Sequence, residues 1–505
     1  MDTQNTQAAQ KNRLFKMFTI LLIVITFTIV AGLFVHIVEN FRGKTAFEKW
    51  KNTHPDFNLD FRAYIPPEVP DDQNFAICGV FKDTIPLFSQ TPKSEQVKTN
   101  DLLIYNLQSM IHLLSDNNTS ESLIDISETA KNIRQNTNNF PDLPAKATDA
   151  EVLFYASKKS NQIFDELRDC IETKPRARFP IDYTDVSPRL PHLTKINQLT
   201  RILQLRVVAF LETGKTDEAF QNARLAFILA NSIKDENFMI SQLVRFNILN
   251  RCCNIIHEGI RRSAWNQTHL SQFQSILYPL NTLQDFVKTI PADTAWLIHA
   301  VEKARITKPD FLDELLSMSK TQPNEYTCCP PTEKTNPIAI KLIPHGWFYQ
   351  NYVNLSHYMH SISTEGFDTQ NNRVFPKKIE ALTGTIWAQK NTPYTLLVKV
   401  VAQKDTFSKA AFTQTTINCY KLACAIEKYR LQNKSIPEKL DTLTPQYIQT
   451  IPSDIIDGKP LRYNQEKNNR YTIYSIGWDE KDNGGANCKK TTEKDKDWAV
   501  TIRWL

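Results

Sequence analysis

The segment MFTILLIVITFTIVAGLFVHIV, residues 17–38, decides the architecture of this chain because it contains no Asp, Glu, Lys or Arg. A helix rises about 1.5 Å per residue, so a segment of this length spans roughly 33 Å, enough to cross the hydrocarbon core of a bilayer. Cleavable signal peptides have a shorter apolar stretch, of roughly 7–15 residues. We therefore predict an uncleaved transmembrane anchor from Met17 to Val38, with the lipid bilayer as its partner.

Basic residues lie on both sides of this anchor, with Lys11 and Arg13 before it and Arg42 and Lys44 after it. A short basic tail before a first membrane helix usually stays in the cytoplasm, and long domains cross the membrane largely regardless of their charge. We therefore predict a short cytoplasmic tail at residues 1–16. The protein is then a single-pass protein of the cell membrane whose large domain is extracytoplasmic, in the periplasm.

The composition is that of a folded protein, with 41% hydrophobic and 23% charged residues in a chain of 505. The net charge of +6 is spread along the chain, which gives no basic face for a nucleic-acid partner. Only 12 residues are glycine, and neither G-x-x-x-x-G-K-[ST] nor G-x-G-x-x-G occurs. These observations argue against a nucleotide-binding enzyme.

The nine cysteines do not follow the spacing of a metal site, and two adjacent pairs, Cys252–Cys253 and Cys328–Cys329, are poorly placed to form disulfides within the pair. In an oxidising compartment one or two longer-range disulfides are compatible with the sequence, but their pairing cannot be read from it. Most of the cysteines are expected to be buried as small hydrophobic side chains.

Helical periodicity dominates the middle of the chain. We predict a connecting region at residues 39–100, with proline-rich turns and one or two strands, followed by a helical domain at residues 101–405. Within these residues the apolar spacing predicts helices near 102–114, 149–172, 195–212, 217–230, 238–260, 270–288, 294–306 and 347–363.

Residues 195–262 give the strongest helical signal. A tight turn at Gly214 separates two amphipathic stretches, and Thr216 or Asp217 suits the N-cap of the second, which predicts an antiparallel helical hairpin. Phe210, Gly214 and Ala226 fall at the spacing of a tetratricopeptide repeat, which this piece resembles. A generic helical bundle explains the same small residues.

A small α+β domain is predicted at residues 406–505. A long helix comes first, and a polar turn at 457–460 precedes three predicted strands at Leu461–Asn464, Tyr471–Ile476 and Trp498–Trp504. The fold class is therefore mainly α: a transmembrane helix, a bundle of helical hairpins and this C-terminal unit.

Three segments of the C-terminal domain carry a resemblance: AIEKYRLQNKSIPEKLDTLTP (425–445), IPSDIIDGKPLRYN (451–464) and YTIYSIGWDEKDNGG (471–485). In order and spacing they resemble the C-terminal half of the major pseudopilin of type II secretion, over about Thr413–Leu505. Pseudopilins join their membrane helix directly to this helix, whereas a large domain intervenes here. Over its full length the chain resembles bacterial single-pass membrane-anchored proteins that pair a helical middle with this ending, through segments 235–250 and 343–351. That resemblance implies no particular activity.

The pseudopilin resemblance implies calcium as a cofactor, bound by the loop at residues 475–497. Ca²⁺ takes about six to eight oxygen ligands from carboxylates, carbonyl groups and water. The candidate metal ligands are Asp479, Asp482, Asn483, Asp495 and Asp497. The alternative is a solvated charged loop, because several lysines in the same segment dilute its negative charge.

No residue is predicted to be catalytic, since neither G-x-S-x-G nor H-E-x-x-H occurs. We therefore predict a membrane-anchored envelope protein that acts in protein interaction, as an assembly or scaffold component of a secretion- or pilus-like system. Its partners are then other envelope proteins. The alternative is an envelope hydrolase with a non-standard active site.

Overall fold

The computed structural model describes residues 2–82, 124–135, 143–144, 146–308, 343–388, 392, 394–402, 404–466, 470–486 and 496–503. The chain divides into two compact units that each combine distant segments. Unit 1 consists of Met1–Leu59, Thr294–His360 and Gly384–Ala402, and unit 2 of Asp60–Asp293, Ser361–Thr383 and Gln403–Leu505. In the described residues helices predominate over strands, as the sequence predicts.

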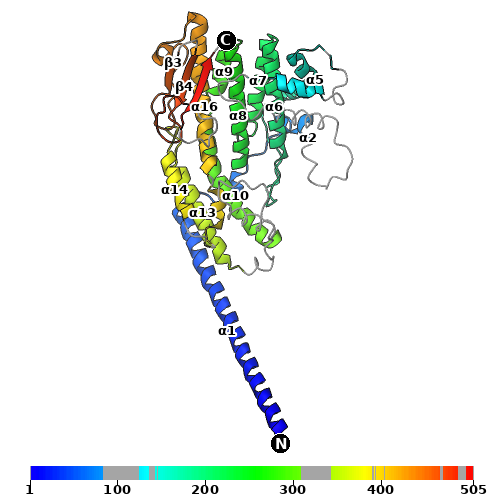
Figure 1. Ribbon diagram of the computed structural model, residues 1–505, viewed down its shortest axis with the longest axis vertical. Coiled ribbons are helices and arrows are strands. Elements are labelled where there is room, and N and C mark those ends of the chain that lie inside the picture. Colours follow the sequence, from blue (N-terminus) through cyan, green and yellow to red (C-terminus); the bar gives the residue numbers. More distant parts are fainter. Residues whose placement is uncertain are drawn as a thin grey trace. The chain divides into compact units, whose positions relative to one another are not determined.

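A single helix, α1, runs from Asp2 to Thr53 and is drawn in blue in Figure 1. One stretch of this helix has a mean hydropathy of 2.8 and none of it is buried, so α1 is long and apolar enough to cross a membrane. The helix continues 15 residues beyond Val38, which corrects the predicted connecting region. Gly43, Phe47 and Trp50 are buried at spacings of four and three, which places them on one helix face.

In unit 1 this buried face of α1 packs against α13, which spans His345–Glu365 and confirms the predicted aromatic helix. The ring of Phe47 lies 5.6 Å from that of Tyr349, and the ring of His54 lies 4.8 Å from that of His360. The short helix α15, Leu396–Val401, joins them, because the Leu397 N–H group donates to Asn351 Oδ1 at 3.2 Å.

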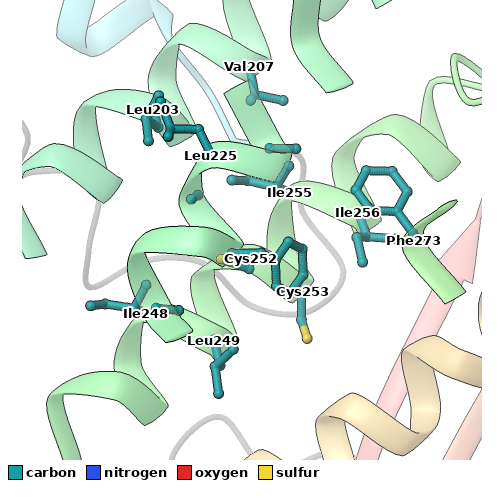
Figure 2. Close-up of a cluster of buried hydrophobic side chains, with 14 of the residues drawn as sticks. Leu203, Val207, Leu225, Ile248, Leu249, Cys252, Cys253, Ile255, Ile256 and Phe273 are labelled. Carbon is teal, nitrogen blue, oxygen red and sulfur yellow. The ribbon is translucent and has the colours of Figure 1, made fainter. Parts of the chain in front are cut away.

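Unit 2 has a helical core. The helices are α5 (Asp149–Thr173), α6 (Pro191–Glu212), α7 (Thr216–Asn231), α8 (Met239–Arg261), α9 (Gln267–Leu277) and α16 (Lys404–Asn433). α6 packs against α5, α7 and α8, and α16 packs against α8 and α9. Figure 2 shows side chains of this core, among them Leu203 of α6, Leu225 of α7 and Cys253 of α8.

The predicted hairpin of α6 and α7 is present. Gly214 between the two helices has a φ of +72°, and the Lys215 N–H group donates to Phe210 O at 2.9 Å. This hydrogen bond caps the C-terminal end of α6. The predicted N-cap is wrong, because Lys215 holds that position without a side-chain hydrogen bond. Asp217 lies in the first turn of α7, where a carboxylate interacts favourably with the helix dipole.

The predicted break between residues 288 and 294 is also wrong. α9 ends at Leu277, just before Tyr278–Pro279, and the next helix, α10, spans Thr282–Thr307 with Pro291 inside it. Tyr278 still has helical φ and ψ of −57° and −47°, and α9 ends there because Pro279 has no N–H group to continue the hydrogen-bond ladder. Asn281 then accepts the Gln284 N–H group at 3.0 Å and helps to start α10. The helix predicted near 102–114 lies outside the described residues.

The C-terminal strands occur as predicted, with β3 at Arg462–Glu466, β4 at Arg470–Ser475 and β5 at Trp498–Arg503. They form an antiparallel sheet in the order β3-β4-β5, with Tyr463 opposite Ile473 and Ile473 opposite Val500. β4 and β5 pack on α16. Tyr471, Ile473 and Ile502 are fully buried under this helix-and-sheet layer.

The remaining elements complete the two units. They are the 3₁₀ helices η1 (Phe61–Tyr64), η2 (Phe75–Ile77) and η5 (Leu440–Leu443), the helices α2 (Gly79–Lys82), α4 (Ser127–Gln135) and α14 (Pro376–Ala388), and the hairpin of β1 (Phe367–Asp368) with β2 (Arg373–Val374). One hydrogen bond attaches β2 to the C-terminal part of unit 2: the Val374 N–H group donates to Ile455 O at 2.8 Å.

Candidate functional site

A cleft in unit 2 is the candidate binding site. It encloses about 360 Å³, the size of pockets that hold small molecules or one or two side chains of a peptide. Four segments line it: the proline-rich stretch 66–69, Phe75 at the start of η2, the extended stretch 175–179, and the end of α7 with the residues that follow. Its lining residues are Pro66, Pro67, Val69, Phe75, Pro175, Arg176, Ala177, Arg178, Phe179, Ile228, Asn231, Ser232, Asp235 and Glu236.

Backbone pairing builds one wall of the cleft. The Phe75 N–H group donates to Arg176 O at 2.9 Å, and the Arg176 N–H group donates to Gln73 O at 3.0 Å. The buried side chain of Asn74 adds two bonds, accepting the Arg178 N–H group at 2.9 Å and donating to Arg178 O at 3.0 Å. The two paired segments, residues 73–78 and 175–179, therefore form a rigid ledge.

A disulfide joins Cys78 to Cys170 beside this ledge, with the two Cα atoms 6.6 Å apart. It connects the residue after η2 to the end of α5, so it fixes the ledge to the helical core. Sequence analysis allowed a long-range disulfide but could not choose its partners.

Buried polar side chains support the floor of the cleft. Glu236 Oε1 lies 2.7 Å from His192 Nε2, and Glu236 Oε2 accepts the Ser241 hydroxyl at 2.6 Å. The His192 ring stacks on Phe179 with centroids 4.6 Å apart. The carboxylate therefore bridges Ser241 and His192 and holds this side of the cleft in place.

Two further contacts fix the cleft rim. The Asn237 side chain donates to Tyr64 O and so holds the stretch before Pro66 and Pro67. Arg178 lies over the Tyr183 ring at 5.5 Å, and its Nε atom is buried with no hydrogen-bond partner in the described part of the chain. Burial raises the pKa of Tyr183 to about 12, so this phenol stays neutral at ordinary pH.

Two of the charged residues that line the cleft are exposed: Arg176 on the ledge and Asp235 after α7. The apolar wall is made of Pro66, Pro67 and Phe179. This arrangement suits an extended peptide segment that places an apolar side chain in the cleft and a carboxylate beside Arg176, since binding sites combine an apolar surface with a few polar groups that fix orientation. Proline on both sides of the opening was the only sequence signal for it.

The predicted calcium loop has a different arrangement. Asp497 is buried, and its carboxylate accepts the N–H groups of Asn483 at 3.1 Å and Gly485 at 2.6 Å. Asp482 accepts the Gly484 N–H group at 3.0 Å and Arg462 Nε at 3.3 Å. The structure therefore brings Asp482, Asn483 and Asp497 into one loop, with the carboxylates bonded to N–H donors.

Two candidate calcium ligands remain. Asp479 accepts the Lys481 N–H group at 3.1 Å, and Asp495 lies outside the described residues. Within the described residues, no group of three or more His, Cys, Asp or Glu side chains is placed to hold a metal ion. Burial raises the pKa of Asp497, although the two N–H bonds to its carboxylate lower it.

Asp454 anchors the same region and was missed by sequence analysis. Its buried carboxylate accepts the Ile456 and Ile476 N–H groups at 2.9 and 3.0 Å, the Ser475 hydroxyl at 2.7 Å and Arg462 at 2.7 Å. Burial raises its pKa, against these hydrogen bonds. An aspartate between apolar residues in IPSDIID was the available signal for such a buried carboxylate.

Comparison with known proteins adds no relative. A scan against protein-family models, a search of curated proteins and a search of solved structures each found no match for this chain.

Proposed function

We propose that this chain is a single-pass envelope protein whose unit 2 binds segments of other envelope proteins in the cleft. The observation that carries the proposal is the ledge at residues 73–78 and 175–179, which backbone pairing and a disulfide hold rigid beside the cleft. A preformed rigid site of this kind lowers the entropy cost of binding an extended peptide.

The membrane anchor and its direction are part of the proposal. The length and hydropathy of α1 support an anchor. The Cys78–Cys170 disulfide supports an extracytoplasmic large domain, because disulfides persist in oxidising compartments and are rare in the cytosol.

A role in a secretion- or pilus-like assembly is the finer part of the proposal. It is supported by the order of α16, β3, β4 and β5, which matches the pseudopilin resemblance. A tetratricopeptide-like array has weaker support, because α6 and α8 begin at Pro191 and Met239, 48 residues apart, whereas that repeat recurs about every 34 residues. Helical hairpins of other lengths also present surfaces to partner segments.

Site-specific photo-crosslinking in the native membrane tests the cleft. A photo-reactive residue at Ser232, inside the cleft, should give a discrete crosslinked product with another envelope protein, whereas one at Tyr278, exposed elsewhere in unit 2, should not. Arg176→Glu should abolish the product, and Lys439→Glu, which reverses an exposed charge outside the cleft lining, should leave it unchanged. A product that survives Arg176→Glu would count against recognition in the cleft.

Calcium binding by the loop that contains Asp482, Asn483 and Asp497 remains a separate proposal. A ligand that binds only the native state must stabilise it. Added Ca²⁺ should therefore raise the thermal midpoint relative to EDTA, and Asp497→Asn should remove that difference. Equal midpoints with Ca²⁺ and with EDTA would reject the site.

A further inference from the structure

The pairing of α1 with α13 fixes where the body of unit 1 begins along the membrane helix. A Cβ atom on Gly346 would lie 1.8 Å from Glu39 O, and a Cβ atom on Gly43 would lie 2.3 Å from Gly346 O, so the two backbones touch. Farther along, Phe47 meets Tyr349 and His54 meets His360. The two helices therefore run in the same direction, and α13 starts beside residues 39–43.

The height of this crossing follows from helix geometry. Gly43 lies five residues beyond Val38, which is roughly 7.5 Å along the axis at about 1.5 Å per residue. The headgroup layer of a bilayer is about 5–7.5 Å thick on each side of the hydrocarbon core. If residues 17–38 span the core, the first turn of α13 lies at the level of the lipid headgroups.

The side chains at this level suit a membrane interface. Tyr394 Oη donates to Glu39 Oε2 at 3.2 Å, and the Trp347 ring meets the Tyr394 ring edge-on with centroids 6.1 Å apart. Trp and Tyr concentrate at the headgroup level of membrane proteins; here both rings are part-exposed, while the Trp347 Nε1 atom itself is buried. Phe41 adds an apolar side chain that is 76% exposed.

The last turn of α10 reaches the same end of unit 1. Glu302 lies 2.9 Å from His345 Nε2, and Arg305 lies 5.5 Å above the Phe348 ring. Ile306, the next residue, is 75% exposed. Arg42 is 66% exposed and Arg305 is part-exposed, so cations accompany the apolar groups. This mixture is typical of a surface that contacts phospholipid headgroups.

We propose that this end of unit 1, the interfacial collar formed by Phe41, Ile306, Trp347, Tyr394 and Arg42, rests in the phospholipid headgroup layer of the membrane that α1 crosses. The inference depends on the proposed membrane anchor. Its occupant is lipid because the collar is continuous with the lipid-facing surface of α1 and stands at headgroup height. It gives unit 1 a fixed height and a second contact with the bilayer besides the spanning helix.

Fluorescence quenching of the full chain in lipid nanodiscs tests the collar. Lipids that carry a nitroxide on the headgroup should quench part of the tryptophan emission. Trp347→Phe should remove most of that quenching, whereas Trp265→Phe, which replaces a buried tryptophan of unit 2, should leave it unchanged. Quenching that is equal in wild type and Trp347→Phe would overturn the proposal.

A second variant separates the collar from the anchor. Phe41→Glu combined with Ile306→Glu changes two exposed side chains, so folding should survive, while headgroup quenching of Trp347 should fall. The matched control is Tyr278→Glu, an exposed change in unit 2 that should have no effect. A failed anchor appears differently, as wild-type protein that does not co-elute with nanodiscs. Co-elution without headgroup quenching, with Ile306 instead crosslinked to another protein, would reject a lipid occupant.

Discussion

The helix pair α6–α7 in unit 2 and the helix pair α1–α13 in unit 1 are held together by different means. α6 and α7 are adjacent in sequence and pack through side chains such as Leu203, Ala223 and Ala226, all buried. α1 and α13 are far apart in sequence and touch through the backbones of Gly43 and Gly346. When a side chain at the α6–α7 interface is shortened, its neighbours can partly move into the space. The Gly43–Gly346 contact has no side chain to shorten, so it responds to added atoms.

The largest effect should come from removing side-chain volume at the α6–α7 pair. Leu203→Ala should lower the free energy of unfolding by about 2–5 kcal/mol, because it leaves a cavity in a fully buried site. Urea unfolding with hydrogen exchange should localise the loss to α6 and α7. Gln221→Ala, exposed on α7, should stay within about 0.5 kcal/mol of wild type. A loss no larger than that of the control would mean that this hairpin is loosely packed.

The next effect depends on whether water reaches His257 in the core of unit 2. His257 on α8 is buried, and neither ring nitrogen has a hydrogen-bond partner in the described residues. Burial lowers its pKa to about 3, with Arg261 and Arg262 also lowering it. Below its unfolded pKa of about 6.5 the unfolded state binds the proton more readily, so stability should fall as pH drops toward 3. By pH 4 the loss from this residue should reach about 3 kcal/mol.

The measurement is the free energy of unfolding at pH 7 and pH 4. His257→Leu should shrink the difference between the two values, and His357→Leu, an exposed histidine on α13, should not. If both variants keep the full difference, His257 is hydrated or paired in solution, and the core of unit 2 is wetter than its packing indicates.

The backbone contact should respond to an added methyl group. Gly346→Ala places a Cβ atom against Glu39 O, so we expect a cost of about 1–3 kcal/mol from overpacking. Hydrogen exchange should increase in residues 39–53 and 345–360 only. Gly384→Ala is the matched control in unit 1, because nothing lies within 4 Å of its Cβ position. Equal results for the two variants would remove the distinction between the helix pairs.

The smallest effect should come from the turn between α6 and α7. Gly214 has a φ of +72° and open space around its Cβ position. Gly214→Ala should therefore lower the free energy of unfolding only by the cost of a left-handed alanine, about 1 kcal/mol. Thermal unfolding can measure this, and Gly214→Asn should recover part of the loss because Asn tolerates that conformation. A cost at Gly214 above that at Gly346 would reverse the order proposed for the two glycines.

The same contrast explains what could be predicted from the sequence. The helix pair α6–α7 was predictable because apolar residues recur with helical spacing on both sides of Gly214. The strands at Tyr471 and Trp498 were predictable from alternation. These signals are local, and they are produced by neighbours within one element.

The contacts that build the sites are not local. The sequence near Gly346 does not indicate that it contacts Gly43. The sequence near Asn74 does not indicate that its side chain hydrogen-bonds to the Arg178 backbone. The residues that line the cleft come from four segments, so only the fold brings them together. The break at Pro279 rather than Pro291 shows a related limit, since a proline stops one helix and is accommodated in another according to the packing around it.

The bond between Cys78 and Cys170 has a topological consequence. The two residues are 92 positions apart, so the disulfide and the chain between them together form one covalent ring. A protease that cuts the chain once anywhere inside this ring releases no fragment, because both new ends remain attached through sulfur. The cut becomes visible on a gel only after a reductant opens the ring, and a chain made where thiols stay reduced lacks this protection.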